Sequence, residues 1–364
     1  NGNRFYYLTR TQFPVFMEMV KLLESNGILD FTGANVKSIN RSQTKSIRSL
    51  EARILFVAEK YYLSIWKGTE RYKPEFGLFS YSDGAGGSSN HSKVVIRPET
   101  GLAEPRSKEL HSQRVYAESG WDMSYSRFGL DPQNWLPVDL NFMLFGYTKQ
   151  LAGLFLKTGQ LEKAKMFSDE AAEIDRNLKK YLYDSETGIY MDYNFVEKRL
   201  SKVVTAASFF PFYFEIYDKN EKSRNALRSL SSILKPNGSQ ALHTTNRRGP
   251  GQWDDAWSWA PLNEIAFQSM IKYEMNEDAH SLAFDYSKMV ITSFHSNQQK
   301  FFEKYWAVDG SISLPKDTEI YGNEEGFGWT NGTLAVFLDF LTKSHSVKNL
   351  EKEIQNQLDT KNAL

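Results

Sequence analysis

The sequence contains no cysteine, which excludes disulfides and thiolate metal ligands. A net charge is also lacking: 44 basic side chains balance 44 acidic ones, so no broad positive field is present to hold a nucleic-acid backbone. No stretch approaches the roughly 20 apolar residues that a membrane-spanning helix needs. We therefore expect neither a nucleic acid nor a membrane as a partner.

Several common catalytic motifs are missing as well. The six histidines show no paired metal-ligand spacing such as His-Glu-x-x-His. No Gly-x-Ser-x-Gly elbow of a serine hydrolase is present. The glycine-rich run at residues 84–87 lacks the Lys-Ser/Thr of a phosphate-binding loop. We expect chemistry that requires neither a metal ion nor a cofactor.

Aromatic residues, in contrast, are abundant. The chain has 8 Trp, 19 Tyr and 25 Phe, which together make up 14% of its 364 residues. Core packing explains many of them. Trp and Tyr also stack on the apolar faces of sugar rings, so an aromatic-lined sugar cleft is the alternative explanation.

The dominant hydrophobic period is helical. Apolar residues recur at spacings of three and four in residues 54–65, 140–155 and 164–178, as amphipathic helices require. Alternation of period two is scarce, and Lys93–Ile96 fits either a small strand or an extended loop. The pattern predicts an all-α chain of about eleven helices. The remaining helices are expected near residues 11–25, 105–117, 202–217, 221–234, 261–275, 277–295, 330–343 and 346–360.

Three long connections separate these helices, at residues 67–104, 235–260 and 307–329. Loops of this length are usually either functional or disordered. These contain Trp, Arg and carboxylates as well as Gly, which favours function. No repeat or composition break marks a linker, so we expect one domain over residues 1–345. A C-terminal helix or polar tail is expected over residues 346–364.

Two clusters combine carboxylates with tryptophan. Residues 117–124 (Ala-Glu-Ser-Gly-Trp-Asp-Met-Ser) set Asp122 beside an indole, which disfavours the ionised form and suits a general acid. A helix-capping Asp is the alternative. Residues 251–262 place three Trp and two Asp between a Gly/Pro loop and a helix. This second cluster fits a sugar platform or a corner of the core.

Further polar candidates lie in two other regions. Glu303 and Glu319 flank a loop that leads to a glycine-rich helix entry at residues 326–332, although charged surface loops are common. Arg10 and Arg97 stand in unusual local sequences. An Arg can fork to paired sugar hydroxyls or orient a carboxylate, and a surface ion pair is its simpler role.

Taken in order, these segments resemble trehalases of glycoside hydrolase family 37. The family's patterns are matched at residues 1–4, 6–12, 97–99, 117–122, 137–141, 252–254 with 259–262, 303–305 and 326–332. The chain departs from the family in three places. The Pro-Gly-Gly-Arg-Phe signature expected upstream of Asn1 is absent from it. Residues 309–323 lack the usual glycine-rich stretch, and residues 254–258 differ from Asp-x-Pro-x-Gly.

The resemblance implies an (α/α)6 toroid, here N-terminally incomplete, that hydrolyses α,α-trehalose to two glucoses with inversion at one anomeric carbon. By position in the motifs, Asp122 is the expected general acid and Glu303 the expected general base. Candidates for holding sugar and water are Asn1, Arg10, Gln12, Arg97, Glu99, Trp253, Asp254, Trp259, Glu319 and Trp329. We expect a monomer that binds trehalose.

Three alternatives remain open at this point. Another inverting (α/α)6 glucosidase, such as a glucoamylase-like enzyme, shares the fold and the carboxylate chemistry. A truncated chain that binds sugar without turning it over is the second, and a purely structural helical scaffold is the third. Trehalose is often met outside the cytoplasm, so a secreted or periplasmic site is expected, with a cytoplasmic one as the alternative.

Overall fold

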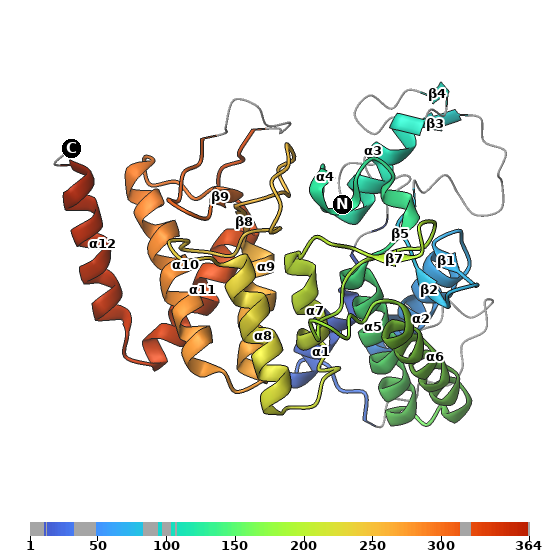
Figure 1. Ribbon diagram of the computed structural model, residues 1–364. Helices are drawn as coiled ribbons and strands as arrows, with labels where there is room; N and C mark the ends of the chain where they lie inside the picture. Colours follow the sequence, from blue (N-terminus) through green and yellow to red (C-terminus); the bar gives the residue numbers. More distant parts are fainter. Residues whose placement is uncertain are drawn as a thin grey trace. The chain divides into compact units, whose positions relative to one another are not determined.

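Helices dominate the structure, a computed structural model, as the hydrophobic period predicts (Figure 1). The structure describes residues 11, 13–32, 49–82, 94–96, 103–105, 108–313 and 322–362. The chain divides into two compact units. Unit 1 comprises Asn1–Trp121, Asp131–Tyr183 and Asp192–Leu200, and unit 2 comprises Asp122–Leu130, Asp184–Met191 and Ser201–Leu364.

Unit 1 is built from five α-helices and small antiparallel sheets in its described part. Its helices are α1 (Phe16–Ser25), α2 (Leu50–Tyr61), α3 (Lys108–Ser119), α5 (Val138–Lys157) and α6 (Leu161–Tyr181). A π-helical segment (Tyr62–Lys67) continues α2, and a 3-10 turn covers Pro132–Asn134. The strands pair as β1 (Tyr72–Lys73) with β2 (Leu78–Phe79), β3 (Val94–Ile96) with β4 (Ala103–Pro105), and β5 (Trp135–Leu136) with β6 (Tyr193–Asn194) and β7 (Arg199–Leu200).

The core of unit 1 lies around α5, which packs beside α6 (Figure 1). Most of the 20 residues of α5 are buried, because this helix is apolar on nearly every side. Helix α6 buries only a stripe that includes Phe167. The Phe167 ring stacks on Phe155 at 5.6 Å between centroids and meets Tyr62 edge-on at 5.7 Å. The two sequence patterns thus produce one enclosed helix and one surface helix.

The described part of unit 2 contains the remaining helices and one short β-ladder. Its helical elements are α4 (Tyr125–Phe128), a 3-10 turn (Ala206–Phe209), α7 (Phe210–Tyr213), α8 (Glu221–Leu234), α9 (Ala260–Lys272), α10 (Asn276–Ser296), α11 (Gly328–Lys343) and α12 (Val347–Asn362). Helix α8 begins at a capping box, in which the Asn220 side chain accepts from the Ser223 N–H. Strands β8 (Trp257–Trp259) and β9 (Lys304–Trp306) pair antiparallel.

Two local expectations were tested by this arrangement. The single helix expected over residues 202–217 is wrong: the 3-10 turn and α7 occupy part of it, because Pro211 lacks an N–H and stands at the start of α7. Val94–Ile96 is a strand, one of the two options left open.

The single domain over residues 1–345 stays a prediction. Helix α12 occupies most of the C-terminal segment and packs on α10 and α11.

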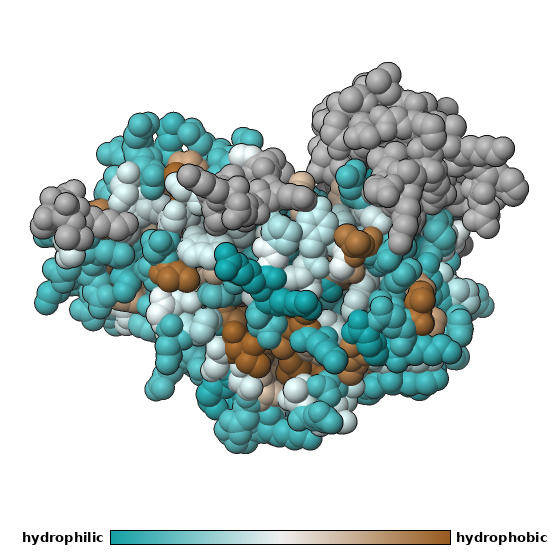
Figure 2. All heavy atoms as spheres, turned by 45° about the horizontal axis from the view of Figure 1, so that its top comes forward, coloured by the Kyte–Doolittle hydropathy of each residue, from teal (hydrophilic) through white to brown (hydrophobic). Residues whose placement is uncertain are grey.

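The visible described surface is mostly hydrophilic, with hydrophobic residues in small areas (Figure 2). No helix in the described ranges is long and apolar enough to cross a membrane.

Candidate active site

Asp122 lies in a tight connection that follows α3. Helix α3 ends at Ser119, whose hydroxyl accepts from the Trp121 N–H and donates to the Tyr116 carbonyl. Asp122 is half-buried, and the next residue, Met123, adopts a positive φ of 60°. Such a φ is unusual for a residue with a side chain and indicates that the surrounding contacts fix this turn.

Asp254 supplies those contacts within unit 2. One oxygen, Oδ1, accepts from the Ser124 hydroxyl (3.1 Å), the Ser126 N–H (3.0 Å) and the Ser126 hydroxyl (2.6 Å). The other, Oδ2, accepts from the Gly251 N–H at 3.1 Å. Asp254 is fully buried, and burial raises its pKa while these hydrogen bonds oppose the shift. Its carboxylate therefore ties the segment that carries Asp122 to the tryptophan-rich loop.

The tryptophan-rich loop approaches the turn after Asp122 so closely that only glycine fits at residue 251. A Cβ added to Gly251 would lie 1.4 Å from the Met123 carbonyl oxygen. At Gly249 a Cβ would lie 2.1 Å from Asp254 Oδ2. Gly251 is thus needed for close packing against the turn after Asp122, and Gly249 for close packing against Asp254.

Three tryptophans form one cluster beside this turn. Trp253 and Trp259 stack at 3.9 Å between centroids and 7° between planes. Trp329, at the start of α11, meets Trp259 edge-on at 5.7 Å. Trp259 is 0% exposed and Trp253 4%, whereas Trp329 is half-buried. Direct contact with sugar stays a prediction for all three and for Asp254.

Glu303 lies immediately before β9, on a firmly held backbone. Its N–H donates to the Glu324 carbonyl at 2.9 Å, and its carbonyl accepts from Trp329 Nε1 at 2.9 Å. The side chain is 4% exposed. Its Oε2 lies 2.8 Å from Nζ of Lys304. The expected base is therefore a buried carboxylate beside a cation.

Lys304 is a residue that sequence reasoning missed, although it follows Glu303 directly in the matched motif. Its side chain is 0% exposed, and Nζ lies 5.1 Å from the centroid of the Trp259 ring. The β8–β9 register sets Lys304 opposite Trp259. Burial lowers the pKa of Lys304, whereas the charges of Glu303, Glu324 and Asp122 raise it. The ammonium group thus contacts Glu303 directly, and the charge of Asp122 also influences it. Both expected catalytic carboxyl groups belong to unit 2.

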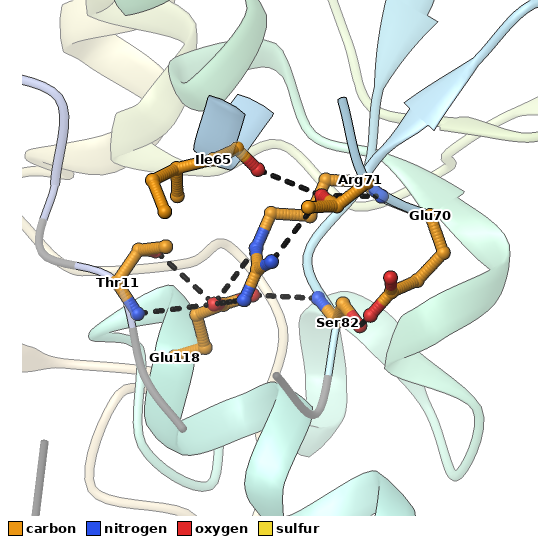
Figure 3. Close-up of polar contacts among 7 residues, drawn as sticks. Thr11, Ile65, Glu70, Arg71, Ser82 and Glu118 are labelled. Carbon is orange, nitrogen blue, oxygen red and sulfur yellow. Dashed lines mark hydrogen bonds and ion pairs between the residues drawn. The ribbon is translucent and has the colours of Figure 1, made fainter. Parts of the chain in front are cut away.

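A second polar cluster, centred on Glu118, lies in unit 1 (Figure 3). Glu118 Oε1 accepts from the Thr11 N–H (3.1 Å), the Thr11 hydroxyl (3.1 Å) and Arg71 Nε (3.0 Å). Arg71 Nη2 contacts the same oxygen, and the Ser82 N–H donates to Oε2 at 2.6 Å. Both charged side chains are buried. Sequence reasoning assigned no role to either, because they stand 47 positions apart and meet only in the fold.

The remaining expected sugar-binding residues lie outside the described part of the chain: Asn1, Arg10, Gln12, Arg97, Glu99 and Glu319. Thr11, between Arg10 and Gln12, is described and is held by Glu118. Among the described residues, no group of three or more His, Asp or Glu side chains could hold a metal ion.

Known proteins resemble this chain both in sequence and in fold. A family model described as trehalase matches residues 1–342. Periplasmic trehalases of Escherichia coli strain UMN026 and of Shigella flexneri are each 28% identical over 358 residues, with 94% of this chain and 60% of theirs covered. The chain therefore spans about 60% of the length of these curated relatives.

Among solved structures, neutral trehalase of Saccharomyces cerevisiae superposes with a TM-score of 0.71 at 22% identity, covering 95% of this chain and 65% of that one. A GH63 mannosylglycerate hydrolase of Thermus thermophilus, in complex with glucose, gives a TM-score of 0.52 at 15% identity, with 91% and 77% covered. These likenesses confirm the predicted fold, the all-α (α/α)6 toroid. Because the family model matches nearly the whole chain, the chain belongs to the trehalase family.

Proposed function

We propose that this chain is a glycoside hydrolase that cleaves α,α-trehalose into two glucose molecules with inversion at one anomeric carbon. The observation that carries the proposal is the match to the trehalase family over residues 1–342, a range that includes both Asp122 and Glu303. The chain spans only part of its relatives, so its own activity rests on this inference.

The reaction needs two carboxyl groups and no cofactor. The bridging oxygen of trehalose joins two acetal carbons. Asp122, protonated at the start, donates its proton to this oxygen as the bond to one anomeric carbon breaks. Glu303, ionised at the start, takes a proton from the water that attacks this carbon from the opposite face. The products are two glucoses, with Asp122 left ionised and Glu303 protonated, and one proton transfer restores the enzyme.

The surroundings of the two carboxyl groups support these roles. Glu303 forms a buried ion pair with the Lys304 ammonium, with 2.8 Å between Oε2 and Nζ. Asp122 is half-buried and its turn is held by Asp254 through Ser124 and Ser126. We expect the two carboxyl groups to lie about 6.5–9.5 Å apart, because an inverting enzyme admits a water molecule between base and sugar.

Substrate recognition is assigned to the groups that the family motifs supply. We expect Arg10, Gln12, Arg97 and Glu99 to bind sugar hydroxyls, and Asn1 and Glu319 to contribute further polar contacts. We expect the half-buried Trp329 to offer aromatic surface to a sugar ring face, with the enclosed Trp253 and Trp259 packed behind it. The hydrogen bond from the Thr11 N–H to Glu118 fixes the backbone at Thr11, between Arg10 and Gln12. A periplasmic or secreted location is proposed because the matched relatives are named periplasmic trehalases.

The direct test is glucose release from trehalose, with maltose as the second substrate. Release from trehalose alone supports the proposal. Release from maltose alone would favour a glucoamylase-like enzyme, and release from neither would favour a sugar-binding chain.

The two carboxyl groups are tested by Asp122→Asn and Glu303→Gln. Each should lower turnover by about 10²–10⁴-fold, because one acid–base group is lost. Asp309→Asn, an exposed carboxyl group in unit 2, is the matched control and should keep its rate. Near-normal turnover in either active-site variant would remove that residue from its role.

A further inference from the structure

Lys304 is an unusual residue to find completely enclosed. Its side chain is 0% exposed, and its ammonium group contacts Glu303 Oε2 at 2.8 Å and the Gly322 carbonyl at 3.3 Å. The charge also lies over the Trp259 ring. A buried ion pair contributes little net stability, because removing two charges from water costs about as much as their attraction returns. Stability alone therefore explains the enclosed lysine poorly.

The electrostatic surroundings of Lys304 suggest a different reason. Three carboxyl groups from separate segments act on its ammonium: Glu303 beside it, Glu324 before α11, and Asp122 after α3. Burial lowers the pKa of Lys304, and these three charges counteract that shift. The lysine is thus a cation in direct contact with the expected base and within the electrostatic influence of the expected acid.

The proposed reaction moves one negative charge between those two carboxyl groups. Before the reaction Glu303 carries the charge, and afterwards Asp122 carries it. In a low-dielectric site such a transfer is costly unless a fixed countercharge lies near both positions. Lys304 supplies such a fixed countercharge at Glu303, 2.8 Å from Oε2, since strand β9 and the Trp259 ring hold its side chain.

We propose that Lys304 is a positioning residue, a fixed cation paired with Glu303 that holds this carboxylate in place as the base and acts as its countercharge before the reaction. This inference rests on the proposed acid and base roles. It does not require Lys304 to touch the substrate. A lysine that only fills space would instead affect folding and leave the pH dependence of the rate unchanged.

The test is the pH profile of kcat/KM for trehalose in the full chain. Lys304→Met and Lys304→Gln remove the charge, and the second keeps a hydrogen-bond donor. In both, the acidic limb should move upward by about 1–3 pH units, the shift that an adjacent opposite charge produces. Lys304→Arg keeps the cation and should keep the limb at its original pH.

Lys300→Met is the matched control: Lys300 lies shortly before Lys304 in the sequence and forms an exposed ion pair with Glu325. It should leave the profile unchanged. An acidic limb that stays in place in folded Lys304→Met or Lys304→Gln would overturn the proposal. Circular dichroism at 10 °C monitors folding. If both neutral variants fail to fold, the role of Lys304 is structural and the proposal is overturned.

A second measurement separates this inference from the proposed function. Infrared difference spectra between the parent chain and Glu303→Gln report the ionisation of Glu303 without substrate. The Glu303 carboxylate band should require a higher pH to appear when Lys304 is replaced by Gln. If the parent chain fails to hydrolyse trehalose, the proposed function is contradicted, and this titration still decides whether Lys304 acts as the countercharge of Glu303.

Discussion

The two units each bury a glutamate, a cation and a tryptophan together. In unit 1 Glu118 pairs with Arg71, whose guanidinium lies 5.9 Å from the Trp66 ring. In unit 2 Glu303 pairs with Lys304, whose ammonium lies 5.1 Å from the Trp259 ring. The composition is the same, but the contacts differ in kind.

Arg71 approaches Glu118 through Nε and Nη2, and backbone N–H groups of Thr11 and Ser82 complete the shell. A guanidinium fork with backbone donors fixes a carboxylate in one position. Lys304 makes a point contact with Glu303 and is also influenced by the charges of Asp122 and Glu324. The first pair is suited to joining chain segments, and the second to a carboxylate whose charge must change.

The largest expected contrast comes from one substitution made at both glutamates. Glu303→Gln should reduce trehalose turnover by about 10²–10⁴-fold and leave the fold intact. Glu118→Gln should instead lower stability and keep most of the turnover at temperatures where the chain is folded. Parallel rate and urea-unfolding measurements check both variants. Equal losses of turnover in the two folded variants would contradict a structural role for the Glu118–Arg71 pair and a catalytic role for Glu303 alone.

Arg71→Met should destabilise the chain by about 3–5 kcal/mol, because it leaves the buried Glu118 charge without its countercharge. The measurement is the free energy of unfolding in urea. Arg199→Met is the control in the same unit, since the Arg199–Glu197 pair is about half exposed. It should change stability by no more than about 0.5 kcal/mol. A similar small change in Arg71→Met would show that the pair does not join the segments.

Asp254 extends the comparison to a buried carboxylate that accepts hydrogen bonds from hydroxyl and backbone N–H groups of Ser124, Ser126 and Gly251. Asp254→Ala leaves the N–H groups of the half-buried Ser126 and of the buried Gly251 without this acceptor. Each loss of this kind costs about 1–3 kcal/mol. Unfolding in urea measures the cost. Turnover should fall as well, because the turn after Asp122 loses its restraint. An unchanged rate would show that Asp254 does not hold Asp122, the proposed acid, in position.

The smallest effect is a pH dependence of stability. Burial raises the pKa of Asp254, so the folded chain holds this proton more tightly than the unfolded chain. The stabilisation is complete below the ordinary pKa of 3.8 and is lost as the pH rises through the raised value. The difference in unfolding free energy between the parent chain and Asp254→Asn should therefore decrease with rising pH in this window. Asp169→Asn, an exposed control, should give a flat difference.

The helices were predictable because their apolar stripes are local. Helices α5, α6 and α8 lie where the period indicates, and the one broken helix contains Pro211. The tertiary contacts of the site were not predictable in this way. Lys304 could be noticed as the neighbour of Glu303, but its enclosure depends on the pairing of β9 with β8. The ion pair of Arg71 with Glu118 and the hydrogen bond from Ser126 to Asp254 each join residues far apart in sequence.

The most direct test of the central claim is the anomeric form of the glucose first released from trehalose, followed by proton NMR before mutarotation. Attack by water on one α-linked carbon with inversion yields one β-glucose, while the other glucose leaves as the α-anomer. We predict equal initial amounts of α- and β-glucose. Release of α-glucose alone would indicate retention and contradict the assignment of Asp122 and Glu303 as an inverting acid and base.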